Sequence, residues 1–195
     1  MSIPDETTLT SLTAIEQAVH DCTACPLAVG RLTAVPGDGD PHSEVLFVGE
    51  GPGQKEDEQG RPFVGAAGKF LDELLAAIGK TRADVFVTNI VKCRPPANRD
   101  PEPDEIKTCT DLFLWKQIEL MGPKLICTLG RYSMSLFFPA EMKISQIHGQ
   151  PKRVRGQVVL PLYHPAAALY NGSMRQTLLY DFKKIPLVLK KIQSA

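Results

Sequence analysis

The sequence lacks three features that would narrow its function at once. No apolar run approaches the length of a membrane-spanning helix, and the first ten residues, MSIPDETTLT, have neither the basic nor the apolar region of a signal peptide. Net charge is absent as well, because 22 basic residues balance 22 acidic ones. We therefore expect a cytoplasmic protein, and any nucleic-acid partner must be held by local basic clusters because no overall positive field attracts it.

The common phosphate-binding loops are also missing. The glycine-rich turn GEGPGQ, residues 49–54, has neither the G-x-G-x-x-G order of a dinucleotide-binding fold nor the Lys-Ser/Thr pair of a P-loop. The chain contains no internal repeat and no low-complexity tract. Its 195 residues, of which 43% are hydrophobic, are therefore expected to form a single domain over residues 1–195.

What the sequence does contain is an alternation of strands and helices. Apolar runs at 45–48, 85–92, 124–130 and 157–165 predict four strands, and amphipathic segments between them predict helices. Strands separated by helices imply right-handed crossovers and a parallel sheet that is covered on both faces. The predicted fold is a three-layer α/β/α sandwich with a central four-stranded parallel sheet.

The five cysteines are best considered as ligands, nucleophiles or core residues, because cytoplasmic thiols stay reduced. Cys127 lies inside an apolar strand and is expected in the core. Cys22 and Cys25 form a C-x-x-C at the end of a predicted helix, whereas Cys93 and Cys109 flank the proline-rich stretch CRPPANRDPEPDE. A redox dithiol should follow a strand and open a helix, which the C-x-x-C here does not.

For any one of these four cysteines, burial in the core is the ordinary explanation. Together they favour a shared metal site, because they lie in polar or proline-rich surroundings where burial does not explain a thiol. Zinc and a four-iron cluster both accept four thiolates. A zinc ribbon normally offers two tight C-x-x-C pairs and only one is present, so the spacing slightly favours an iron–sulfur cluster.

Polar residues follow the predicted strands where a parallel sheet binds its ligands, at the carboxyl ends. The segments after Gly49, Asn89, Gly130 and Tyr163 are therefore expected on one rim. His164 directly follows the last strand. Taken alone, Asn89 can simply turn the chain, and His164 can simply cap a strand edge.

The loop that follows His164 is apolar at Leu169 and Tyr170, although it should be exposed. This pattern suggests a wedge or a surface that contacts a partner.

Four signals now occur in one order: GEGPGQKEDEQGRPFVGAAG (residues 49–68), TNIVKC, the four-cysteine spacing and HPAAAL. Together they resemble the iron–sulfur class of bacterial and archaeal uracil-DNA glycosylases, usually called family 4. The resemblance spans residues 22 to about 170. HPAAAL by itself would not be specific.

The resemblance implies an enzyme of base excision repair. It would flip deoxyuridine out of single- or double-stranded DNA, hydrolyse the N-glycosidic bond, and leave an abasic site and free uracil. It also implies a [4Fe-4S] cluster with a structural role. The implied cluster ligands are Cys22, Cys25, Cys93 and Cys109. We expect a monomer.

By the family pattern, three side chains contact the extruded base. Asn89 would accept from uracil N3–H and donate to O4, a polarity that cytosine reverses at both atoms. Phe63 would stack on the ring, and His164 would donate toward O2 as negative charge develops there. Gly51 and Gly53, which lack side chains, would let the loop backbone approach the nucleotide.

The acidic residues of the glycine-rich segment are expected to differ in their roles. Glu50 and Glu56 match acidic positions of the family motif, and either can orient the attacking water, stabilise the sugar cation or crowd uracil C5. We favour Glu50 for the water or the cation and Glu56 for the base edge where a thymine methyl group would collide. Asp57 and Glu58 are expected to be solvated loop charges.

Local basic residues are the candidates for DNA phosphate contacts, although a solvated basic turn is an equally ordinary explanation for any one of them. Leu169 would be the wedge that fills the gap left by the extruded base. The basic candidates are Arg94, Arg99, Lys152, Arg153, Arg155 and Arg175.

Two other function classes remain open at this point. A non-catalytic iron–sulfur or zinc nucleic-acid-binding module would keep the cysteines and the basic residues, but it has no use for Asn89, Phe63 and His164 in one pocket. A small-molecule hydrolase would use the glycine-rich turn and His164 without needing a wedge loop.

A related branch that crosslinks to uracil carries a histidine in an insert after the Asn motif. CRPPANRDPEPDE contains no histidine, so turnover by water is expected.

Overall fold

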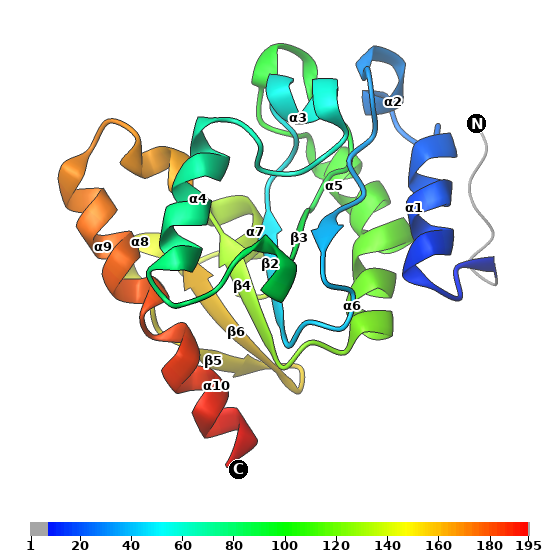
Figure 1. Cartoon of the computed structure of the whole chain (residues 1–195). Helices are drawn as coiled ribbons and strands as arrows, with labels where there is room; N and C mark the ends of the chain where they lie inside the picture. Colours follow the sequence, from blue (N-terminus) through cyan, green and yellow to red (C-terminus); the bar gives the residue numbers. More distant parts are fainter. Residues whose placement is uncertain (1–7, 195) are drawn as a thin grey trace.

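A computed structural model describes residues 8–194; residues 1–7, on which part of the signal-peptide expectation rests, and residue 195 lie outside the described part. The chain forms one six-stranded sheet in the order β1-β3-β2-β4-β6-β5 (Figure 1). Its strands are β1 (Asp38–Gly39), β2 (Val45–Gly49), β3 (Phe86–Asn89), β4 (Leu125–Leu129), β5 (Lys152–Val154) and β6 (Gln157–Leu162).

The four central strands, β3, β2, β4 and β6, are parallel, as the sequence predicts. The two short edge strands were not expected. β1 pairs antiparallel with β3, and β5 pairs antiparallel with β6. The sheet is therefore mixed and has six strands, with the predicted four at its centre.

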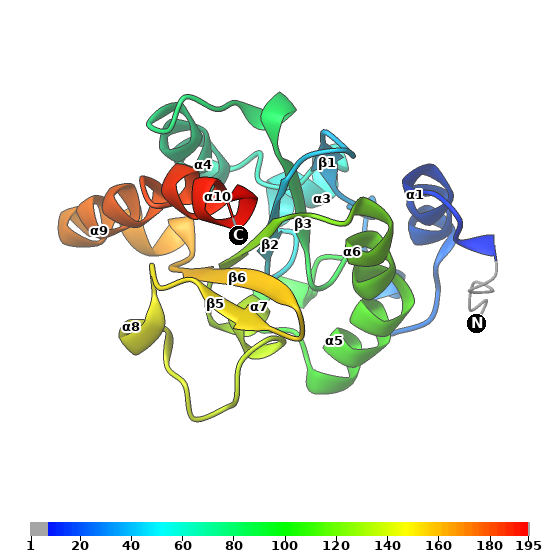
Figure 2. The same cartoon turned by 90° about the horizontal axis from the view of Figure 1, so that it is seen from below.

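Helices cover both faces of the sheet, which confirms the three-layer arrangement (Figure 2). The α4, α9 and α10 helices pack on one face, and α1, α5 and α6 pack on the other. Their bounds are α4 (Ala66–Ala76), α9 (Gly172–Phe182), α10 (Ile185–Gln193), α1 (Leu12–Asp21), α5 (Pro103–Cys109) and α6 (Trp115–Met121).

Alternation along β2 shows how both faces become buried. Val45 and Phe47 point into the core beneath α4, α9 and α10, whereas Leu46 and Val48 point into the other core. All four are at most 1% exposed. A strand with no polar position is typical of a parallel sheet that is covered on both sides.

The amphipathic segment between the second and third predicted strands forms a helix, as the sequence predicts, with one local irregularity. It begins at Pro103, where proline is tolerated because the first helical amides have no partner within the helix. Thr110–Leu114 forms a π-helical turn between α5 and α6. The remaining short helices are α2 (Leu27–Gly30), α3 (Gln54–Gln59), α7 (Arg131–Ser135), α8 (Ile144–Ile147) and the 3-10 turns Arg82–Asp84, Pro96–Asn98 and Pro165–Ala168.

The first helix is capped at its start and leads directly into the C-x-x-C. The side chain of Ser11 accepts a hydrogen bond from the amide of Ala14 (3.1 Å), a cap that begins α1. Ile15 and Val19 are buried beneath it, and Cys22 follows its last turn. The helix therefore delivers the C-x-x-C to the same side of the sheet as α5. In the described residues no helix has the length and apolarity needed to cross a membrane.

Candidate active site

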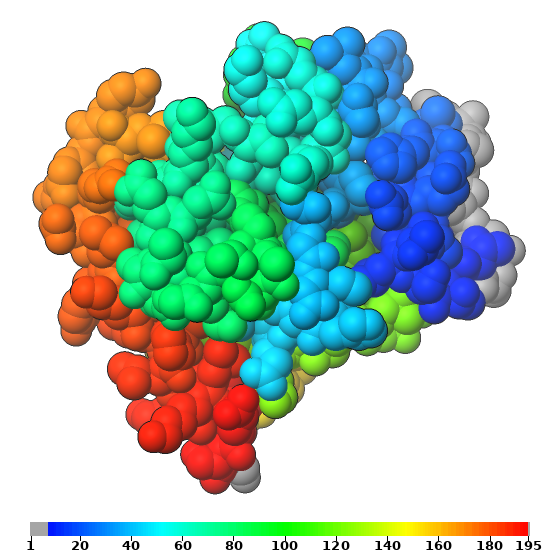
Figure 3. All heavy atoms as spheres, in the orientation of Figure 1, coloured from blue at the N-terminus to red at the C-terminus, as the bar shows by residue number. Residues whose placement is uncertain are grey.

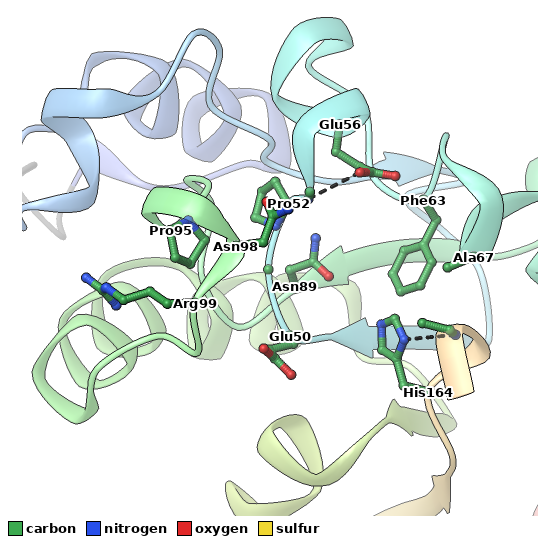
Figure 4. A pocket seen from close by; sticks show the side chains of 13 residues that line it. Glu50, Pro52, Glu56, Phe63, Ala67, Asn89, Pro95, Asn98, Arg99 and His164 are labelled. Carbon is green, nitrogen blue, oxygen red and sulfur yellow. Dashed lines mark hydrogen bonds between the residues drawn. The ribbon is translucent and has the colours of Figure 1, made fainter. Parts of the chain in front are cut away.

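A cavity of about 390 Å³ opens at the carboxyl edge of the parallel strands (Figure 4). Its lining includes all seven residues that the sequence analysis places around the uracil. The lining residues are Glu50, Gly51, Pro52, Gly53, Glu56, Phe63, Ala67, Asn89, Pro95, Asn98, Arg99, His164 and Ala166.

Asn89 forms the floor of this cavity. It is the last residue of β3, lies opposite Gly49 of β2 and is 1% exposed. Its Oδ1 is buried, and no group among residues 8–194 donates a hydrogen bond to it. A buried acceptor without a partner is destabilising, so its presence at the base of a cavity indicates a ligand that donates there.

Gly49 makes this floor possible, and the sequence analysis did not single it out. A Cβ at position 49 would lie 2.3 Å from Asn89 Oδ1 and 2.8 Å from the ring of Phe63. Gly51 lines the cavity with its backbone, and a Cβ there would lie 2.7 Å from the Val91 side chain. The first glycine of the turn is therefore the one at which an added Cβ would crowd Asn89 and Phe63.

Phe63 and His164 form an aromatic wall. Their rings stack with centroids 5.5 Å apart and an interplanar angle of 28°. Phe63 has a φ of 55°, a strained conformation for a bulky residue. Arg82 holds this turn, because its Nη2 donates to the Phe63 carbonyl oxygen at 2.7 Å. Sequence reasoning missed Arg82, which lies in no motif.

His164 is a neutral hydrogen-bond donor in this environment. Burial lowers the pKa of its imidazole to about 4, although Glu56 opposes the shift. The amide of Ala166 donates to Nδ1 (3.2 Å), so in the neutral ring the proton lies on Nε2. Nε2–H is therefore the group that the ring can offer to a ligand.

The two carboxylates of the cavity differ in their surroundings. Glu56 accepts hydrogen bonds from the amides of Gly53 (3.2 Å), Val64 (2.8 Å) and Gly65 (2.9 Å). It thus ties the start of α3 to the turn that carries Phe63. Glu50 is half-buried, and burial raises the pKa of its carboxyl group, with a further rise from Asp100 and an opposing effect of Arg131.

The sequence-based prediction for Asp57 was wrong. Asp57 is not a solvated loop charge, since it is 2% exposed and its Oδ1 accepts from the amides of Leu32 (2.9 Å) and Thr33 (3.4 Å). These bonds attach α3 to the segment after α2, and the two segments lie side by side at the top of Figure 3. Glu58 is exposed, as expected, although it belongs to α3 and interacts there with Gln54 and Lys55.

The four predicted ligand cysteines surround one small cavity, together with Arg31 and Lys92. Burial raises the pKa of Cys109 to about 12 and also raises the pKa values of Cys25 and Cys93. The charge of neighbouring cysteines raises these three pKa values further. Cys22 acts on Cys25, and Cys25 acts on both Cys93 and Cys109. Cys127 lies apart, fully buried in the core as predicted.

Positive charge and hydrogen-bond donors accompany these sulfurs. Arg31 Nη1 donates to Cys93 Sγ (3.1 Å), and the amide of Lys92 donates to Cys109 Sγ (3.3 Å). Among residues 8–194 no group of three or more His, Cys, Asp or Glu side chains is placed to hold a metal ion. A four-iron cluster takes one thiolate at each iron, so it requires a wider ring of sulfurs than a single ion does.

The predicted DNA-contacting residues do not all lie on the rim of the cavity. Arg99 lines the cavity, and Arg94 is bonded to Asn98, which also lines it. Arg175 lies over the face of Phe70 and pairs with Glu73.

Three predicted DNA contacts lie elsewhere. Lys152, Arg153 and Arg155 belong to the β5–β6 hairpin, whose turn precedes β6, at the opposite end of that strand from His164. These three residues are therefore not among those that line the cavity.

The loop after His164 presents a different side chain from the one predicted. Leu169 is half-buried and packs against the core beneath α4 and α9. Tyr170 is 98% exposed. Hydrogen bonds from the amides of Leu169 and Asn171 to the carbonyls of Ala166 and Ala168 hold the backbone on both sides of it.

Comparisons with known proteins agree with this arrangement. The model of the family "Uracil DNA glycosylase superfamily" matches residues 36–184. A "Type-4 uracil-DNA glycosylase" of Sulfurisphaera tokodaii is 48% identical over 187 residues, which cover 90% of this chain and 83% of that protein. Proteins of the same name from Saccharolobus solfataricus and Thermotoga maritima are 47% and 42% identical, covering 90% and 91% of this chain and 85% and 94% of their own.

Proposed function

The chain belongs to the type-4 uracil-DNA glycosylases of the uracil DNA glycosylase superfamily, and from this premise we propose how its cavity releases uracil from DNA. It is a DNA-repair enzyme that hydrolyses the bond between uracil N1 and deoxyribose C1′. The base must leave the helix to enter a cavity of this kind, and its sugar becomes cationic as the bond breaks.

Asn89 reads the base in this proposal, and its unpartnered Oδ1 is the observation that carries it. Uracil N3–H would donate to Oδ1, and Nδ2 would donate to uracil O4. Cytosine has an acceptor at N3 and a donor at N4, so both pairs would become repulsive. Because the acceptor is buried, leaving it unpaired is costly, and rejection of cytosine is expected to be strong.

Phe63 and His164 would hold the ring and its developing charge. The departing uracil takes the electron pair of the N-glycosidic bond, and part of the negative charge collects on O2. The Nε2–H of neutral His164 would donate to O2, while the adjacent ring of Phe63 would stack on the base. A donor that is already in place needs little reorganisation during the reaction.

Glu50 is the residue that we propose for the sugar side. Its half-buried carboxylate lies at the carboxyl end of β2 and can orient the attacking water or stabilise the cation on C1′. Glu56 is already committed to three backbone amides. We propose that it forms, with the backbone of Gly51 and Gly53, the wall beside uracil C5 that excludes a thymine methyl group.

A [4Fe-4S] cluster is the cofactor that we propose for the four cysteines. The name of the relatives is consistent with it, and the ring of four thiols beside two cations fits an anionic thiolate-bound group. When bound, it would supply iron–thiolate bonds that fix α1, the proline-rich loop and α5 to one another. All five cysteines are free of disulfides, as a reducing compartment such as the cytoplasm requires.

DNA would lie across the carboxyl edge of the sheet. Arg94, Arg99 and Arg175 would contact phosphates there, and the exposed ring of Tyr170, beside Leu169, would enter the stack. Lys152, Arg153 and Arg155 lie at the far end of β6, so we propose no phosphate contact for them in this complex. We also propose that a monomer suffices and that single- and double-stranded DNA are both substrates.

A single assay tests the function. The protein is incubated with matched oligonucleotides that carry uracil, thymine or cytosine at one position, and the products are then treated with alkali, which cleaves abasic sites. We expect strand scission only with uracil, in single- and double-stranded DNA alike. No scission with uracil in either form would end the proposal.

A further inference from the structure

Lys92 is a charged residue that is buried in the interior of the protein. It is 1% exposed and belongs to the largest fully buried side chains. Its ammonium group donates three short hydrogen bonds, to Thr88 Oγ1 (2.6 Å), Asn89 O (2.8 Å) and Gln117 Oε1 (2.7 Å). All three acceptors are neutral, and no ion pair among residues 8–194 includes Lys92.

A buried ammonium group without a carboxylate needs negative charge from elsewhere, because removing it from water is expensive. The sulfurs of the cluster site are the available source. Lys92 lines the same small cavity as the four cysteines, and its own amide donates to Cys109 Sγ at 3.3 Å. Four thiolates bound to iron would place negative charge in the cavity that Lys92 lines.

The ammonium group of Lys92 also reaches the base-reading strand. The carbonyl that it holds belongs to Asn89, whose side chain forms the floor of the cavity. Thr88, which also accepts from Lys92, donates to the carbonyl of Pro36 (2.8 Å), and Gln117 Nε2 donates to the same carbonyl (2.9 Å). The ammonium group therefore organises the polar network that fixes the carboxyl end of β3.

We propose that Lys92 is a positioning residue that couples the four-cysteine site to uracil recognition, because the thiolates balance its charge while its ammonium group fixes the backbone of Asn89. This inference rests on the proposed function, since it requires Asn89 to read the base. It predicts that loss of the metal group disturbs uracil binding through Lys92, before the protein unfolds. The metal group would then support specificity as well as architecture.

The test compares Lys92→Met with the wild-type protein, each with its metal group and after its removal by a chelator. The readout is the affinity for free uracil, measured by calorimetry, which does not require turnover. In the wild-type protein, removal of the metal group should weaken uracil binding about tenfold, within the range typical of coupled sites. Lys92→Met with its metal group should show a similar loss, and removal should then change little.

Additive losses would overturn the proposal, because independent effects add whereas coupled ones do not. Unchanged uracil affinity in metal-loaded Lys92→Met would also overturn it. Iron content and visible absorbance per chain verify loading in each sample. Lys190→Met, on an exposed position of α10, is the matched control and should behave as wild type.

A second variant covers the case in which Lys92→Met does not fold. Thr88→Val removes one acceptor of Lys92 and keeps the buried charge. It should shift the carboxamide NMR signals of Asn89 and lower uracil affinity while iron content stays at the wild-type level. Unshifted signals together with unchanged affinity would contradict the coupling. If the wild-type protein releases no uracil from DNA, the proposed function fails; if it does, and these variants match it, the coupling alone fails.

Discussion

The ring of Phe63 and the imidazole of His164 stack with centroids 5.5 Å apart at an angle of 28°, although the two residues are far apart in the sequence. The turn after α3 supplies one ring, and the segment after β6 supplies the other. Asn89, from β3, lies on the floor between these elements. The cavity is thus assembled by the parallel register of the strands, because their carboxyl ends meet at one edge.

Gly49→Ala should strongly impair uracil excision while leaving the protein folded. The added Cβ would displace Asn89 Oδ1, from which it would lie 2.3 Å, and the ring of Phe63, at 2.8 Å. A misplacement of this size should lower kcat/KM by about 10²-fold or more. Gly30→Ala is the matched control, because a Cβ there meets nothing within 4 Å. Equal activity of the two variants would contradict the assigned floor.

The pH dependence of His164 follows from its burial. Its pKa is lowered from 6.5 to about 4, so the folded protein excludes a proton that the unfolded chain binds between these values. The contribution of His164 to stability should therefore be complete above pH 6.5 and be lost as the pH falls toward 4. An NMR titration of the ring checks this, and a midpoint near 6.5 in the folded protein would refute the neutral-donor role.

Tyr170→Ala should impair excision from duplex DNA by about tenfold and affect single-stranded DNA much less. An exposed aromatic ring can stack in the gap that the extruded base leaves, and stacking of this kind contributes about 1–3 kcal/mol. Tyr180→Ala, at an exposed position of α9, should have no effect. Leu169→Ala should mainly lower the melting temperature, because Leu169 packs against the core. A duplex-specific loss in Leu169→Ala, with Tyr170→Ala active, would reverse the assignment.

Cys93→Ala should lose the visible absorbance of the metal group, DNA affinity and thermal stability together. The thiol accepts a hydrogen bond from Arg31 and lines the same small cavity as the other three sulfurs, so its removal opens the site that joins α1, the proline-rich loop and α5. Cys127→Ala should retain the absorbance and DNA binding, because Cys127 is a core residue. A Cys93→Ala protein that keeps both stability and DNA affinity would remove the structural role of the site.

Much of this architecture could be predicted from the sequence. The unbroken apolar runs give the four parallel strands, and the positions that follow them give Glu50, Asn89 and His164 on one edge. The helical periodicity before Cys22 and after the proline-rich loop brings the four cysteines to one side. These features follow from local patterns that burial enforces directly.

Other features could not be predicted, because their cause lies in distant contacts. Asp57 looks like a solvated charge until Leu32 and Thr33 are seen to donate to it. Arg82 belongs to no motif, and its role depends on the Phe63 turn. The β5–β6 hairpin did carry a local signal, because Gly156 follows Arg155 in a two-residue turn in which both residues have positive φ.

The selectivity of the Asn89→Leu variant is the most direct test of the central claim that a buried carboxamide reads uracil. Single-turnover excision is measured on matched oligonucleotides with uracil or cytosine, alongside the affinity for uracil-free DNA. We expect the variant to lose at least about 10³-fold of its rate on uracil, because both hydrogen bonds to the base disappear, while affinity for uracil-free DNA is retained. Uracil excision by Asn89→Leu at the wild-type rate would contradict the account.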